Sequence, residues 1–203
     1  MKTKLCFLFS IIAITFILYS CNSSSADYLP ADSTLSANNN SYGGYASQAQ
    51  WGEHIVTIAG CNDCHTPKKM TAQGPVLDTA LSLSGSLAHP LLAPITPDQV
   101  AKGMAATLDL TAWTGPWGKS YAANITSDST GIGNWTEQQF MDCLRKGLYK
   151  GLANSRPLMP PMPWQGFAKM TDGELKAVFA YLKTTKAIHN VVPEYEPPTT
   201  AMK

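Results

Sequence analysis

Apolar residues recur three and four positions apart in several segments of this chain, and this spacing predicts amphipathic helices. The first such segment begins near Tyr45, and its apolar face is formed by Trp51, Ile55, Ile58 and Ala59. We therefore expect the folded part of the chain to begin with a helix that leads into residues 61–65.

Three further helices are predicted by start signals, in which a threonine is followed three residues later by glutamine or glutamate. These signals begin at Thr96, Thr136 and Thr171, and Pro97 strengthens the first because proline suits the first helical position. Helical apolar spacing follows the last two signals, at Phe140, Leu144, Leu148, Leu175, Val178, Phe179 and Leu182. Residues 66–95 and 111–134 are expected to form ordered loops, and the alternation over 107–112 allows a short strand.

Residues 1–20 have the pattern of a targeting segment. Lys2 and Lys4 precede an apolar stretch from Leu5 to Leu18 that is short for a membrane span. The stretch ends before Cys21 in a sequence that resembles a bacterial lipoprotein signal, which predicts lipid attachment at Cys21. An uncleaved anchor and an ordinary signal peptide remain alternatives, and all three place the domain outside the cytoplasm, in the cell envelope.

The segments that flank the predicted domain, residues 45–192, are of simple composition. Residues 21–44 are rich in Ser, Asn and Ala and predict a flexible tether, whereas the proline-rich residues 193–203 predict an extended surface tail. The chain has 15 Lys and Arg residues against 14 Asp and Glu residues. This balance gives no general attraction to nucleic acid, so no nucleic-acid partner is expected.

Residues 61–65, Cys-Asn-Asp-Cys-His, carry the most specific chemical signal in the chain. The spacing places Cys61 and Cys64 on one side of a helical turn, where both thiols can form thioether bonds to the vinyl groups of a c-type haem. His65 then supplies the proximal iron ligand. A redox dithiol lacks its usual βαβ context here, and a zinc site lacks a second Cys/His pair.

Cys143 is the cysteine that neither haem nor lipid explains. It lies at helical spacing with Phe140, Leu144 and Gly147, which favours a buried apolar role over a reactive thiol.

A methionine sulfur is a common sixth ligand in haem electron carriers. Residues 156–164 contain four prolines and two methionines, Met159 and Met162, so they predict a stiff loop that could present a sulfur at low entropic cost. Met162 is the preferred candidate, with Met159 next and Met170, Met104 or a histidine as further alternatives. Met104 and Met141 lie at apolar helical spacing, where core packing is the expected role.

Taken together, these features resemble the class I c-type cytochromes. The resemblance sharpens in Ala122–Thr126, Thr130–Thr136, Leu144–Gly147, Met162–Trp164 and Ala180–Leu182, which are similar to the cytochrome branch that includes subunits of periplasmic alcohol and sugar dehydrogenases. It implies an all-α class I cytochrome c fold, in which the first and last helices cross over the haem and long ordered loops lie between them. It also implies that Gly52 lies at the helix crossing, near Tyr181.

The resemblance implies Met162, rather than Met159, as the iron ligand. It also implies that Asn124, Trp135 and Arg145 lie near the haem propionates. Trp164, with the tryptophans at 113, 117 and 135, is a candidate pocket wall or indole donor. The dehydrogenase subunits typically carry three haem motifs and this chain has one, so a dehydrogenase-specific role does not transfer.

The sequence therefore predicts a membrane-tethered, extracytoplasmic carrier of single electrons with one haem c. Its donor and acceptor would be redox proteins whose identity the sequence does not give. An electron-accepting subunit of a dehydrogenase or oxidase complex is the alternative, and a peroxidase or a haem-based sensor is less well supported. Residues 141–170 carry an excess of positive charge, with cations at Arg145, Lys146, Lys150, Arg156 and Lys169 against Asp142. An ordinary solvated face, with one arginine held by a propionate, is the preferred interpretation. A patch that steers the haem edge toward an acidic partner is the alternative.

Overall fold

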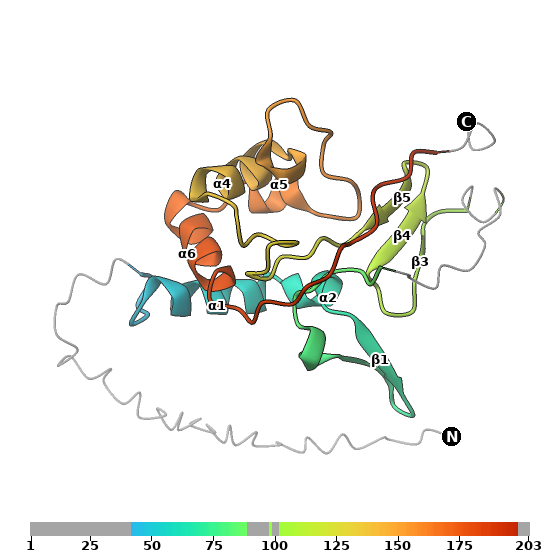
Figure 1. Ribbon diagram of the computed structural model, residues 1–203, viewed down its shortest axis with the longest axis horizontal. Helices are drawn as coiled ribbons and strands as arrows, with labels where there is room; N and C mark the ends of the chain where they lie inside the picture. Colours follow the sequence, from blue (N-terminus) through green and yellow to red (C-terminus); the bar gives the residue numbers. More distant parts are fainter. Residues whose placement is uncertain (1–41, 89–97, 99–101, 199–203) are drawn as a thin grey trace, which may run out of the picture. The chain divides into compact units, whose positions relative to one another are not determined.

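The computed structural model describes residues 42–88, 98 and 102–198 (Figure 1). The predicted targeting segment, Cys21 and most of the tether lie outside these residues, as does most of the helix predicted from Thr96.

The first helix, α1 (Gln48–Ile58), is capped by Ser47, whose side chain accepts a hydrogen bond from the Gln50 amide. Gly60 then adopts a left-handed conformation and starts the short helix α2 (Cys61–His65). Ile55 and Val56 are buried, as their spacing with Gly52 requires. Ile58 is 69% exposed, so its predicted place on the buried face was wrong.

Helix α1 packs against the last helix, α6 (Asp172–Leu182), at Gly52. A Cβ atom added to Gly52 would lie 1.8 Å from the Ala177 carbonyl oxygen and 2.8 Å from the Tyr181 Cβ. The two backbones therefore approach within a distance that glycine alone permits, and the predicted approach of Gly52 to Tyr181 is confirmed.

The other helices are α4 (Glu137–Lys146) and α5 (Trp164–Phe167), with 3-10 turns η1 (Thr79–Leu81) and η2 (Tyr149–Gly151). Thr136 caps α4 as predicted, and Thr171 with Glu174 forms the predicted capping box of α6. The Gln139 side chain donates to the Lys150 carbonyl, 2.9 Å away, and thereby joins α4 to η2.

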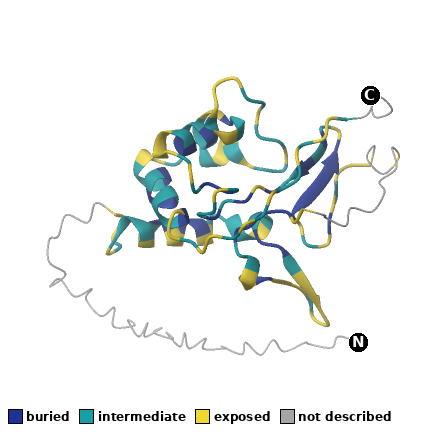
Figure 2. Cartoon of the chain, viewed as in Figure 1, coloured by how far each residue is buried: buried dark blue, intermediate teal, exposed yellow. Residues whose placement is uncertain are grey.

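The hydrophobic core lies where α1, α4 and α6 meet (Figure 2). Its buried members come from these helices and from two loops: Ile55, Val56, Leu83, Ile132, Phe140, Ala177, Val178 and Leu182. Phe140 and Phe179 pack with ring centroids 5.3 Å apart. Cys61 packs against the same cluster, so the Cys-x-x-Cys-His turn is attached directly to the core.

Two small antiparallel sheets occupy regions that the sequence predicted mainly as loops (Figure 1). One is the hairpin β1 (Lys68–Thr71) and β2 (Gly74–Leu77); the other has the order β3 (Ala105–Ala106), β4 (Ala112–Gly115) and β5 (Gly118–Tyr121). The strand allowed over 107–112 begins only at Ala112, because residues 107–110 form a turn closed by the Leu110 amide and the Thr107 carbonyl. Of the described residues, most members of the hydrophobic core nevertheless come from the helices, and none comes from the strands of these two sheets.

Residues 186–198, after α6, are irregular apart from an isolated bridge at Glu196, and they are hydrogen-bonded to the loops that they cross. The extended tail over residues 193–203 stays a prediction. Glu196 pairs with Lys119 of β5 through both backbone hydrogen bonds, at 2.8 and 3.1 Å. None of the helices in the described part of the chain has the length and apolarity needed to cross a membrane.

The contact at Gly52 predicts that Gly52→Ala lowers the free energy of unfolding by more than about 2 kcal/mol, because the added methyl group must push α1 and α6 apart. Gly166→Ala is the matched control. It also adds a methyl group to a helical glycine, but no atom lies within 4 Å of the new Cβ position. Urea unfolding of the two variants should separate them clearly, and equal losses would contradict the packing described for α1 and α6.

Candidate haem-attachment site

The turn α2 brings together the three residues of the predicted haem motif. Cys61 and Cys64 lie three positions apart on one face of the helix, and both are half-buried and free of any disulfide. Burial raises the pKa of the Cys61 thiol to about 11 and also raises the pKa of the Cys64 thiol. Both side chains are therefore protonated thiols in the spacing that two thioether bonds require.

The imidazole of His65 is held by one hydrogen bond. Its Nδ1 lies 2.7 Å from the carbonyl oxygen of Ala123, and because a carbonyl only accepts, Nδ1 carries the proton. Burial lowers the pKa of His65, which favours the neutral ring. Nε2 is then left with its lone pair, as a metal ligand requires, so the residues present fit a haem with His65 as the axial ligand.

Residues 83–86 lie between α2 and the segment that carries Ala123. The Gly85 amide donates to the His65 carbonyl, 2.8 Å away, and the Ser86 amide donates to the Ala122 carbonyl, 2.9 Å away. Gly85 has a φ of 78°, and a Cβ there would lie 2.5 Å from the Ala122 carbonyl oxygen. A glycine is therefore needed where these backbones meet.

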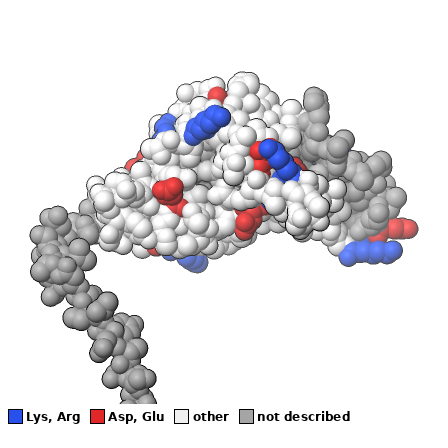
Figure 3. Space-filling model, turned by 90° about the horizontal axis from the view of Figure 1, so that it is seen from below, with Lys and Arg blue, Asp and Glu red and all other residues white. Residues whose placement is uncertain are grey.

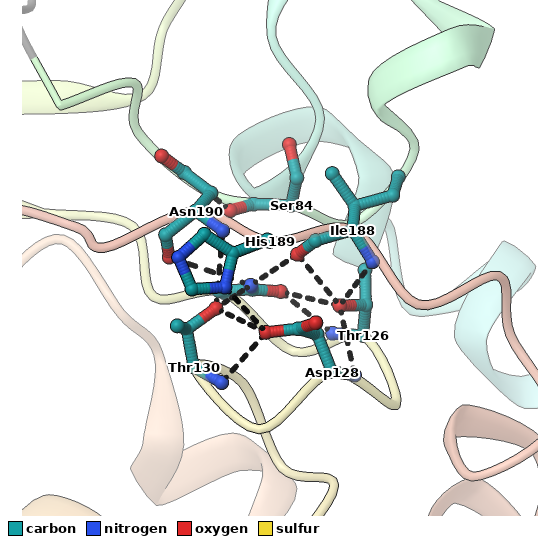
Figure 4. A network of polar contacts seen from close by, with 8 residues as sticks. Ser84, Thr126, Asp128, Thr130, Ile188, His189 and Asn190 are labelled. Carbon is teal, nitrogen blue, oxygen red and sulfur yellow. Dashed lines mark hydrogen bonds and ion pairs between the residues drawn. The ribbon is translucent and has the colours of Figure 1, made fainter.

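Asn190, in the segment after α6, is hydrogen-bonded to the layer formed by residues 83–86 (Figure 4). Its side-chain amide donates to the carbonyls of Ser84 and Ser86, at 2.8 and 2.7 Å, and its backbone amide donates to Thr130 Oγ1, 3.0 Å away. Thr130 in turn donates to Asp128. The network links the loop behind His65 to the segment that closes the domain.

The polar atoms of Asn124 are already engaged within the protein. Its amide donates to the Ile188 carbonyl at 2.8 Å and to Thr130 Oγ1 at 3.0 Å, and its oxygen accepts from the Thr126 hydroxyl and amide. Asn124 thus closes the loop after β5 onto the last segment. Its predicted contact with a propionate stays a prediction.

Three other predicted pocket residues, Arg145, Trp135 and Trp164, lie on the helical side of the domain. Trp113 is instead buried in β4, and Trp117 lies in the turn between β4 and β5. Arg145 joins α4 to α6, donating to the Ala168 carbonyl and to Asp172, both at 2.6 Å. Trp135 is half-buried against the core, and the Trp164 ring covers Gly147 at the end of α4. Their roles as haem contacts likewise remain predictions.

Met159 and Met162 both lie half-buried in the proline-rich loop, and the Met162 amide donates to the Met159 carbonyl, 3.2 Å away. The choice between them as the iron ligand stays a prediction. Met141 is buried as expected, but Met104 is 51% exposed beside β3, so its predicted core role was wrong. Cys143 is buried as predicted, and this burial raises its pKa to about 11.

Two of the cations counted in the positive stretch of residues 141–170 are paired with carboxylates. Lys146 pairs with Asp142 at 3.0 Å, Arg145 pairs with Asp172, and the Arg156 guanidinium lies 4.0 Å from the centre of the Tyr149 ring. The face drawn in Figure 3 is seen from below Figure 1, away from α4 and α5, and carries separated charges of both signs. The pair of Lys146 with Asp142 is already contained in the sequence count, so only the ion pair of Arg145 with Asp172 lowers the excess, and a docking role for these residues stays a prediction.

Sequence reasoning missed three residues that organise this site: Ala123, Ser120 and Asn190. Ala123 acts through its carbonyl group, which no side-chain pattern can reveal. Ser120 donates to the Pro160 carbonyl of the proline-rich loop, 40 positions away, and Asn190 donates to the Ser84 carbonyl, more than 100 positions away. Both are polar residues in stretches without periodicity.

The chain is similar to cytochrome subunits of several dehydrogenases. It is 40% identical over 70 residues to the fructose dehydrogenase cytochrome subunit of Gluconobacter japonicus, and 38% identical over 79 residues to the alcohol dehydrogenase (quinone) cytochrome c subunit of Gluconobacter oxydans. It is also 37% identical over 79 residues to the gluconate 2-dehydrogenase cytochrome c subunit of Pantoea cypripedii. No protein-family model matches the chain.

These similarities cover 34 to 38% of this chain and only 14 to 16% of the length of the three relatives. They support a cytochrome c domain and, with it, a haem c cofactor and a role in electron transfer. They are consistent with an electron carrier rather than a catalytic subunit.

The network around Asn190 predicts that Asn190→Ala lowers the free energy of unfolding by about 2 kcal/mol, because two backbone carbonyls lose their donor. Asn154→Ala, at an exposed turn, is the matched control and should change it by less than about 0.5 kcal/mol. Thermal unfolding of the two variants measures the difference. If the two midpoints shift alike, the contacts of Asn190 contribute little to holding the layer behind His65.

Proposed function

We propose that this protein is an extracytoplasmic, membrane-tethered carrier of single electrons with one covalently attached haem c. In this proposal Cys61 and Cys64 attach the haem, His65 and Met162 are the axial ligands, and the domain has the class I cytochrome c fold. The observation that carries the proposal is the hydrogen bond from His65 Nδ1 to the Ala123 carbonyl, since it leaves Nε2 free beside two unbridged thiols.

The haem would supply a one-electron iron couple, and the protein would set the reduction potential of that couple. The hydrogen bond to Ala123 orients the imidazole and holds its proton on Nδ1, whereas burial lowers the pKa of His65 and favours the neutral ring. A thioether from the proline-rich loop would favour the reduced iron and would keep small molecules from it. Cys61 packs against the core, so a haem bonded to it would be attached to the rigid part of the domain.

The lipid anchor at Cys21 rests on the sequence pattern of residues 1–21. Covalent haem attachment agrees with a location in the cell envelope, because lipoprotein anchors and c-type haem both occur there. In this proposal the tether of residues 21–44 would hold the domain near a membrane while leaving it free to turn toward its partners.

The second candidate is an electron-accepting subunit in a dehydrogenase complex. The named relatives favour it, because each is called a cytochrome subunit of a dehydrogenase. Its donor would then be a catalytic dehydrogenase subunit, and a second redox protein would accept the electron. The two candidates share the same haem chemistry and differ only in whether the donor stays bound.

The proposed ligation predicts that Met162→Ala keeps covalent haem but opens the iron to azide in the oxidised form, because only the weak sixth ligand is lost. The reduction potential should fall, since a methionine ligand raises it. Met159→Ala is the matched control and should leave azide binding and potential near those of the unaltered protein. Absorption spectroscopy and a redox titration measure both effects.

A denaturing gel stained for haem provides the attachment control. Met162→Ala should keep the stained band, whereas the double variant Cys61→Ala/Cys64→Ala should lose it. Azide binding that appears in Met159→Ala instead would assign the ligand to Met159, and a stained band in the double cysteine variant would refute covalent attachment through this motif.

A further inference from the structure

We infer that Ser120 is a positioning residue for the sixth iron ligand and that it acts by fixing the loop that carries Met162. This inference rests on the proposed His65/Met162 ligation. It assigns a role in ligand geometry to the sheet β3–β4–β5, which lies outside the helical core.

The contact that carries the inference joins β5 to the proline-rich loop. The Ser120 hydroxyl lies 2.5 Å from the Pro160 carbonyl oxygen and must donate to it, because a carbonyl only accepts. Ser120 also accepts a hydrogen bond from Trp117 Nε1, 3.1 Å away. The indole therefore orients the hydroxyl, and the hydroxyl holds a carbonyl two residues before Met162.

The loop transmits this constraint because its backbone is stiff. Pro160, Pro161 and Pro163 each have a restricted φ, so a fixed Pro160 carbonyl limits where Met162 can lie. The loop starts at the hydrogen bond from the Leu158 amide to the Gly147 carbonyl, at 2.7 Å. In the described part of the chain, Ser120 makes the hydrogen bond that reaches residues 159–162 from outside the loop.

The same stretch of chain also holds the proximal ligand. Ala123, whose carbonyl accepts from His65 Nδ1, follows Ser120 by three residues. A single segment, β5 and its continuation, is thus bonded to both of the elements that carry the proposed ligands. A displacement of this segment would alter the two ligand positions together.

The last segment of the chain secures β5 on its free side. Beyond the backbone pairing of Glu196 with Lys119, the Glu196 carboxylate accepts from Lys119 Nζ at 2.7 Å and from the Tyr121 hydroxyl at 2.6 Å. The Tyr195 hydroxyl donates to the Trp117 carbonyl, 2.6 Å away. Ser120 is therefore presented by a strand that is paired on both edges.

The test compares Ser120→Ala with Ser127→Ala in the holoprotein. Ser127 is half-buried and its hydroxyl also donates to a carbonyl distant in sequence, that of Thr185 at 2.6 Å, but within the described part of the chain it is hydrogen-bonded to neither the proline-rich loop nor residues 83–86. Ser120→Ala should bind azide in the oxidised form about fivefold to tenfold more tightly, and the Met162 amide should exchange faster by a similar factor, because one hydrogen bond no longer restrains the loop. Ser127→Ala should change neither quantity, and Ser120→Thr, which keeps a hydroxyl, should restore both.

The outcomes separate this inference from the proposed ligation. If the unaltered protein already binds azide as Met162→Ala does, the ligation is wrong, and amide exchange at Met162 alone then decides whether Ser120 fixes the loop. If the unaltered protein excludes azide and Ser120→Ala behaves like Ser127→Ala in both measurements, the role of Ser120 is refuted while the ligation stands.

Should Ser120→Ala yield no holoprotein, Trp117→Phe provides the second variant. It keeps an aromatic ring but removes the indole donor that orients the Ser120 hydroxyl. Azide should then bind more tightly by a smaller factor than in Ser120→Ala, about twofold to threefold. Azide binding equal to that of the unaltered protein would overturn the inference.

Discussion

The hydrogen bond between His65 Nδ1 and the Ala123 carbonyl is the interaction on which the account of this domain depends. It fixes the tautomer and direction of the imidazole, and it joins the Cys-x-x-Cys-His turn to a segment 58 positions later. The surrounding layers reinforce it. Residues 83–86 lie between the two partners, and Asn190 holds that layer from the last segment.

The helices and the remaining parts of the domain have different structural roles. Helices α1 and α6 meet backbone to backbone at Gly52 and give a rigid core to which Cys61 is attached. The small sheet β3–β4–β5 and the last segment carry the polar contacts that reach the His65 side and the proline-rich loop. A substitution in the helical core should therefore lower the free energy of unfolding. Loss of a hydrogen bond in the sheet should instead change how firmly the segments that carry the proposed iron ligands are held.

The sequence predicted the helices with caps and the haem motif because their signals are local. Thr136, Thr171 and the spacing of residues 61–65 each act within one turn of chain. It did not predict the sheets, because their strands are only two to four residues long and give little alternation. It did not predict the ion pair of Arg145 with Asp172, because these residues are 27 positions apart. Ile58 and Met104 show the same limit, since apolar spacing does not tell which side of a helix, or which segment, the core will cover.

The most direct test of the central claim is a coulometric reduction of the protein as purified from the cell envelope and fully oxidised, followed by its absorption spectrum. An electron carrier with one haem takes up one electron per chain in a single wave, and a ferrous cytochrome spectrum appears in step with it. Uptake of two electrons without a haem band would instead indicate that Cys61 and Cys64 form a disulfide that is reduced to a dithiol, and no uptake would indicate a redox-inert site. Either of these results would contradict the account.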